Sequence, residues 1–439
     1  MTDQVIPTAG PGPGPGRKAA TLRDAVQARL KGRHRQEMRF RLYGRLAIVL
    51  ALSFLAVLLG RIVLQGYTTF IDYQMSVPVY VDPAKVDRKD LAGANFDLLV
   101  AEAVLARLGE KDDDLGEKSS KVMELVSNDL GFQLLKQLRV NPNLIGQTVT
   151  LKGPVRADAS LYYKGEMKRA TTEGDRKLDD TQLNWLDRMK TLGMVNSSFN
   201  IGFLTRSDST EPEQAGVLGA VVGSALMLLV TAALAVPIGV LAACYLEEFA
   251  PKNRWTDVIE VNINNLAAVP SIVYGLLGLA VFINWLAVPR SSPLVGGLVM
   301  ALMALPTVII ATRSALKAVP PSIREAALGI GASKTQTVFH HVLPLAMPGV
   351  MTGAILSLAH ALGETAPLLM IGMISFVPGV PAGFTAAATV LPVQVFIWEN
   401  ASERAFHERT AAAIMVLLIF MILMNLAAII LRRRFERRW

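Results

Sequence analysis

The sequence predicts an all-α integral membrane protein with six transmembrane helices and a soluble α+β insert after the first of them. Of its 439 residues, 52% are hydrophobic, and the mean hydropathy is +0.39. Six apolar runs are each long enough to cross a bilayer, and a charged segment from Gly66 to Ala215 separates the first run from the others. This composition excludes an ordinary soluble domain.

Positive charge is concentrated at the two ends of the chain. Residues 1–45 contain ten basic and three acidic residues, and residues 432–439 contain five arginines and one glutamate. Residues 66–215 contain 23 acidic and 19 basic residues. Lys and Arg beside a span resist translocation, which favours cytoplasmic ends and a periplasmic insert over nucleic-acid binding by the basic ends. The Pro- and Gly-rich residues 1–17 are expected to be disordered.

The spans follow directly from the apolar runs. The first transmembrane helix is expected at residues 46–65; a cleaved signal peptide is the less favoured alternative, because the basic region is long and no A-x-A-like site follows. Residues 216–431 should hold five more spans: 217–246, 263–286, 294–312, 345–374 and 411–431. Residues 376–398 are interrupted by Pro and Gly, which predicts an outer or re-entrant loop.

The insert combines two kinds of pattern. QMSVPVYV (74–81) and GQTVTL (146–151) are typical of strands, and helices are expected within 95–108, 119–138 and 179–192. The acidic run at 111–114 could bind a cation, although a solvated turn is favoured. The single cysteine, Cys244, and five scattered histidines form no ligand set. We therefore expect no catalytic residue, cofactor or metal on this chain.

The segment from Arg324 to Gly349 has the pattern of a loop that another protein could bind. Its order is a short helix, a glycine break and a proline that starts the next segment. The residues that define this pattern are Glu325, Ala326, Ala327, Gly331, Leu343 and Pro344. GASKT, within the loop, lacks the glycine before lysine that a phosphate-binding P-loop requires, so nucleotide binding is not expected here.

A second polar feature lies inside an apolar run. HALGETAPL places His360, Glu364 and Thr365 in a predicted span. Positions 360 and 364 are four residues apart, which would put them on one face of a helix. Ionisable groups within a membrane usually face a pore or each other, which favours a role in a transport path over interhelical hydrogen bonding alone.

Glu-Ala-Ala, then three residues, a glycine and a later Leu-Pro resembles the pattern of permease subunits of ABC importers, in which this loop docks on the ATPase. Further stretches, GETAPL above all, resemble the PstA family of phosphate importer permeases. The resemblance covers roughly residues 215–438 and implies the ABC importer permease fold. His360 stands where that family usually has arginine, and His341 stands where a branched apolar residue is usual. The insert is longer than the family's usual outer segment.

The resemblance implies partners and a function. They are a PstC-like permease, a homodimeric PstB-like ATPase that binds ATP and Mg, and a PstS-like periplasmic phosphate-binding protein, all assembled in the membrane lipid. Our hypothesis is that Glu364 pairs with His360 or with a cation from the partner permease, as a gate or a structural latch. The alternatives are a permease for another oxyanion, a secondary transporter, and a membrane sensor that uses the insert as its receptor.

Overall fold

The computed structural model describes residues 15–88, 90–110, 115–170, 176–373 and 376–435. The chain divides after Arg61 into two parts, and each is described by itself. Helix α1 (Pro15–Gly66) contains the first candidate span. Pro15 to Arg17, within the segment expected to be disordered, belong to α1; proline is compatible with the first turn, because no N–H is required there. Residues 1–14 and the acidic run at 111–114 lie outside the described residues.

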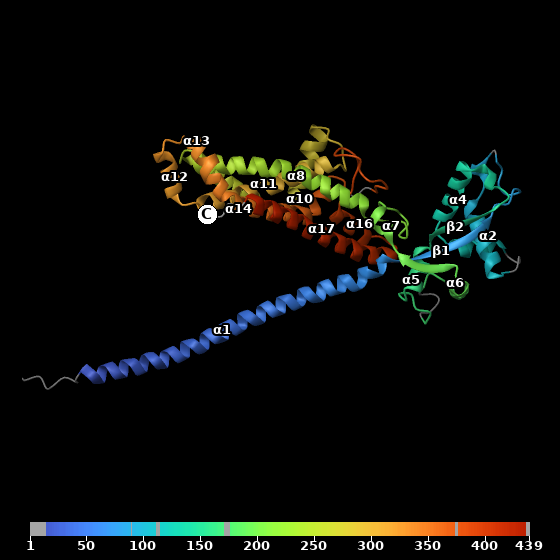
Figure 1. Cartoon of the computed structure of the whole chain (residues 1–439), viewed down its shortest axis with the longest axis horizontal. Coiled ribbons are helices and arrows are strands. Elements are labelled where there is room, and N and C mark those ends of the chain that lie inside the picture. The colour runs from blue at the N-terminus through green and yellow to red at the C-terminus, as the bar shows by residue number, and fades with distance from the viewer. Residues whose placement is uncertain (1–14, 89, 111–114, 171–175, 374–375, 436–439) are drawn as a thin grey trace, which may run out of the picture. The chain divides into compact units, whose positions relative to one another are not determined.

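The insert contains a three-stranded antiparallel sheet in the order β2-β1-β3. Its strands are β1 (Ile71–Tyr80), β2 (Thr148–Pro154) and β3 (Val195–Phe199). Side chains along β1 alternate in burial, and Met75, Val77 and Val79 are fully buried. Helices α2, α4, α5 and α6 lie around this sheet (Figure 1).

The helices of the insert bury a continuous apolar core against the sheet. They are α2 (Phe96–Leu108), α3 (Leu115–Met123), α4 (Asp129–Val140), α5 (Ala157–Tyr163) and α6 (Asp180–Thr191). The insert also has short 3₁₀ turns η1 (Tyr67–Phe70), η2 (Leu91–Gly93) and η3 (Pro142–Leu144), and α7 (Ile201–Thr205) follows β3 and buries Phe203 in a separate cluster. The helix expected within 119–138 is two helices, because the chain between them forms a bridge from Val126 to Val155. The interruption lets both helices pack on the same core.

The two ends of the insert meet at one place. The Asn200 N–H donates to the Phe70 carbonyl at 2.9 Å, and Asn200 Nδ2 donates to the Thr69 carbonyl at 3.0 Å. Asn200 Oδ1 also accepts from the Phe203 N–H and caps α7. The chain therefore enters the insert and leaves it through hydrogen-bonded neighbours.

Five helices are long and apolar enough to cross a membrane, and a bent pair could provide a sixth crossing, among the residues that the structure describes. After α1, the helices of these candidate spans are α8 (Leu218–Cys244), α11 (Pro293–Lys317), α14 (Leu343–Gly363) and α17 (Ala405–Phe435). Glycines allow close packing between them: a Cβ on Gly353 would lie 2.2 Å from Ala311 of α11, and one on Gly239 would lie 2.7 Å from Val308.

Two predicted spans are interrupted. The run 263–286 is covered by α9 (Arg254–Ala267) and by α10 (Ser271–Gly278) with a π-helical extension to Trp285, and the two parts are bent by 100°. Pro270 precedes α10, and its missing N–H and rigid φ favour a break there. The run 345–374 is also broken, because α14 ends at Gly363 and α15 (Ala366–Met370) follows. Both runs had been expected to cross as single helices.

The remaining segments connect these helices. Short π-helical segments extend α8 over Tyr245–Phe249 and precede α14 over Thr337–Val342. The loop expected at 376–398 ends in α16 (Leu391–Glu399), which packs against α17. In Figure 1, α12 and α13 lie at one end of the bundle, and the sheet of the insert lies beyond the other end.

Candidate functional site

The Glu-Ala-Ala loop forms a short helix set across one end of the bundle. Helix α12 (Pro321–Gly329) begins with proline at its first position and is followed by Gly331 at φ +88°, a conformation that glycine adopts without strain. Ser333 then starts α13 (Lys334–Gln336) with a capping box that involves Gln336. The local sequence thus accounts for a helix, a turn and the start of a second helix.

One face of α12 packs on the bundle and the other is free. Ala327 is 4% exposed, whereas Glu325, Ala326 and Leu328 are exposed, and Ile330 is 82% exposed. A large apolar side chain held in the open beside small ones is a feature of binding surfaces. We call residues 325–330, without Ala327, the α12 face. Leu343 and Pro344 lie at the start of α14, half-buried and outside this face, whereas His341 is exposed.

Arg324 fixes the orientation of α12. Its Nη2 donates to Glu248 Oε1 at 2.6 Å, and its Nε lies 3.2 Å from both carboxylate oxygens of Glu248. The same guanidinium donates to the carbonyls of Leu316 and Val319 at 2.9 and 2.8 Å, at the end of α11. Since the side chains of Arg324 and Glu248 are only 23% and 9% exposed, this bidentate ion pair is shielded from water.

A second ion-pair network lies beside the first. Arg313 of α11 donates to Glu260 of α9 at 2.5 Å and to Glu247 at 3.3 Å, and Lys317 lies 3.6 Å from Glu247. The two networks link the ends of α8, α9 and α11 to α12. Sequence reasoning missed Glu247 and Glu248; the signal was present as two adjacent glutamates, in YLEEF, at the end of an apolar run.

His360 and Glu364 lie at the interruption between α14 and α15. His360 is in the last turn of α14, whereas Glu364 follows the helix with extended backbone at φ −84° and ψ 124°. Their atoms Nε2 and Oε1 are 3.5 Å apart, and the side chains are 68% and 27% exposed. Thr365 precedes α15 and is half-buried. The structure therefore brings the three predicted residues together at the end of a helix.

A glycine holds this interruption against α10. Gly275 of α10 lies so close to α15 that a Cβ there would be 2.7 Å from Pro367 Cα and 2.8 Å from its carbonyl oxygen. Leu368 and Ile371 are buried in the core shared with α10 and α11. The GETAPL segment is thus a packed break, with its polar residues on the open side.

Among the described residues, no group of three or more His, Cys, Asp or Glu residues could hold a metal ion. Cys244 is buried and unbridged.

Two family models match the chain. Residues 27–173 match a domain of unknown function, DUF3333, and residues 235–439 match the binding-protein-dependent transport system inner membrane component. The phosphate transport system permease protein PstA 1 of Mycobacterium tuberculosis is 35% identical over 229 residues, which cover 52% of this chain and 74% of that protein.

Other relatives match the same part of the chain. The PstA of Pasteurella multocida is 30% identical over 216 residues, covering 49% of this chain and 76% of that protein. A probable ABC transporter permease of Bacillus subtilis, YqgI, is 30% identical over 248 residues, which cover 53% of this chain and 83% of that protein. Among solved structures, a chain of the MetNI methionine ABC transporter in an inward-facing conformation is 18% identical with a TM-score of 0.42, covering 50% of this chain and 95% of that one.

Proposed function

Because the chain belongs to the PstA family of phosphate transport permeases, we propose that it is one membrane subunit of an ATP-driven importer of inorganic phosphate. A PstC-like permease would complete the path, a homodimeric PstB-like ATPase would bind ATP and Mg, and a PstS-like protein would deliver phosphate. This chain itself would bind no cofactor and catalyse no reaction.

The observation that carries the proposal is the α12 face. It presents Ile330, Leu328 and Ala326 on a rigidly held helix at the end of the bundle opposite the insert (Figure 1). Binding surfaces gain affinity when an apolar anchor is already ordered, because little conformational entropy is lost on docking. The ion pair between Arg324 and Glu248 supplies that order and joins the α12 face to α8.

The proposed topology has six crossings, with α9 and α10 together providing one of them. Both basic ends would then lie in the cytoplasm with the α12 face, and the insert, a soluble α+β domain, would lie in the periplasm. A cytoplasmic α12 face is a requirement of docking on an ATPase.

The proposed substrate path passes the open side of the GETAPL break. Glu364 alone would repel phosphate, and His360 within 3.5 Å reduces that repulsion when it carries a proton. Thr365 adds a hydroxyl beside them. The pair would act as a gate that the partner permease completes.

The test is reconstitution with the partner permease, the ATPase and the binding protein in proteoliposomes. Ile330→Glu should prevent co-purification of the ATPase and ATP-dependent phosphate uptake. Val140→Glu is a matched control, because Val140 is also an aliphatic residue with 82% exposure but lies on α4 of the insert. Uptake of phosphate by this chain without an ATPase would instead indicate a secondary transporter and would refute the proposal.

A further inference from the structure

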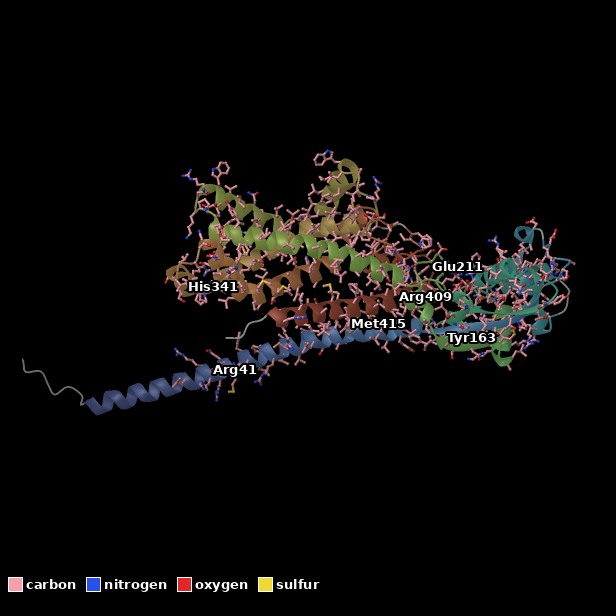
Figure 2. The ribbon with its side chains drawn as sticks, turned by 45° about the horizontal axis from the view of Figure 1, so that its top comes forward. Arg41, Tyr163, Glu211, His341, Arg409 and Met415 are labelled. Carbon is pink, nitrogen blue, oxygen red and sulfur yellow. The ribbon has the colours of Figure 1, made fainter. Side chains whose placement is uncertain are left out.

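A small, partly open cavity of about 20 Å³ lies where the insert joins the spans. Its walls come from η1, the start of β1, α5, the segment before α8 and the start of α17. Figure 2 shows Arg409, one wall residue, where α17 meets the insert, with His341 at the opposite end of the bundle. The cavity therefore lies far from the α12 face.

Ionisable side chains line this cavity. They are Asp72, Lys164, Glu213, Glu408 and Arg409. Lys164 Nζ and Glu408 Oε2 form an ion pair at 2.7 Å with side chains 11% and 9% exposed, and Arg409 donates to the Ala215 carbonyl at 2.7 Å. With three carboxylates against two cations, the cluster has one negative charge in excess when all five groups are ionised.

Three buried oxygen atoms in the walls have no hydrogen-bond partner. They are Thr69 Oγ1, Glu213 Oε1 and Glu408 Oε1. Unsatisfied buried polar atoms are unfavourable by about 1–3 kcal/mol each, and a cavity of more than about 10–15 Å³ with two to four polar neighbours can hold one water molecule. The cavity and its three unpartnered atoms meet both conditions.

We propose that this cavity is a proton-binding site, in which one water molecule bridges Thr69, Glu213 and Glu408 and the proton resides on Glu213. The proton comes from bulk solvent and converts the Glu213 carboxylate to a carboxylic acid. That reaction removes the excess negative charge of the cluster.

The charges around Glu213 favour protonation from its other side as well. Glu213 also lines a larger groove of about 250 Å³, whose ionisable residues are Glu124, Arg156, Asp158, Lys177, Glu211 and Glu403. Arg206, outside the cavity walls but near Arg409 and Asp72, is one cation that opposes protonation. The four acidic and two basic residues of the groove outweigh it. Burial, with a smaller contribution from Glu211, raises the pKa of Glu213 from 4.5 to about 7. Burial also raises the pKa of Asp72.

The site joins three spans to the insert. Thr69 directly follows the first span, Glu213 lies five residues before α8, and Glu408 is in the first turn of α17. Lys164, at the end of α5, connects Glu408 to the insert. Protonation would therefore strengthen the attachment of the insert to the ends of these spans.

The direction of the pH dependence follows from linkage. An acid with a raised pKa in the attached state makes attachment strongest at low pH, and the stabilisation is lost as pH rises from 4.5 to about 7. Between about pH 5 and about pH 8.5, the opening equilibrium should rise by at most roughly 70-fold.

Hydrogen exchange of the full chain in lipid nanodiscs tests this proposal. After correction for intrinsic rates, protection of residues 67–70 and 405–410 should fall as pH rises in the wild type and should change much less in Glu213→Gln. Glu166→Gln, which removes an exposed carboxylate close to Lys164, should behave like the wild type. A pH-independent wild type, or a Glu213→Gln variant with the wild-type profile, would overturn the proposal.

A second measurement uses the wild type and covers the case in which Glu213→Gln does not fold. Infrared difference spectra should show a protonated-carboxyl band that disappears near pH 7. Its persistence to high pH, or stabilisation that requires sodium rather than choline as the cation, would refute proton binding. Neither readout involves phosphate or an ATPase, so the outcome is independent of the proposed function.

Discussion

Replacing Arg324 by alanine should release α12 from the bundle. In the structure, this side chain satisfies the Glu248 carboxylate and two carbonyls of α11, and Glu248 is 9% exposed. Removing one partner of a buried ion pair is unfavourable by about 3–5 kcal/mol, because the other charge stays buried without compensation. We take the lower value, about 3 kcal/mol, since Arg324 is partly exposed; this corresponds to roughly 150-fold in the equilibrium between held and released α12.

The assay has a local and a functional part. Hydrogen exchange of residues 321–330 should accelerate by about two orders of magnitude in Arg324→Ala, and in proteoliposomes phosphate uptake per ATP hydrolysed should fall. The double variant Arg324→Met with Glu248→Met should recover most of the protection, because an apolar pair of similar volume can replace a buried ion pair. If the single variant exchanges like the wild type, or if the double variant is as mobile as the single one, the ion pair does not hold α12.

Substitutions at three further positions, with one control, test packing and the substrate path. Gly223→Ala should destabilise the protein by about 1–3 kcal/mol, because its Cβ would lie 2.1 Å from the Thr389 carbonyl oxygen. Thermal unfolding checks this, with Gly116→Ala, whose Cβ would have no neighbour within 4 Å, as the harmless control. His360→Arg should retain phosphate uptake and His360→Ala should lose about tenfold, since arginine offers two fixed donors and alanine none. Glu364→Gln should reduce uptake and its coupling to ATP hydrolysis; unchanged transport in the assembled complex would exclude a gate.

Sequence could predict the spans that are continuous, but not those that break. The runs that became α8, α11 and α17 are uniformly apolar and helical throughout. Pro270 favours a break, yet a bend of 100° depends on where α9 and α10 find packing partners. The end of α14 before Glu364 likewise depends on the contact of Pro367 with Gly275, which is 92 residues distant in sequence.

The sequence predicted some residues of the candidate site and missed others, again because contacts between distant residues decide part of the structure. The α12 face follows from local spacing, glycine and proline, so its residues were identified. The ion pair that holds this face was not predicted, because Arg324 and Glu248 are 76 residues apart and only the packing of α8 against α11 brings them together. In the insert, VNSSF of β3 lacks apolar alternation, since four of its five residues are exposed. Long-range contacts decide these features.

The meeting of the two ends of the insert has a consequence for the evolution and engineering of the chain. Because Asn200 bonds directly to Thr69 and Phe70, the chain enters and leaves the insert at neighbouring residues. Residues 71–199 can therefore be gained, lost or exchanged as a unit, with a connection of a few residues restoring a continuous chain. A domain attached in this way can diverge at its own rate while the membrane helices stay constrained by packing.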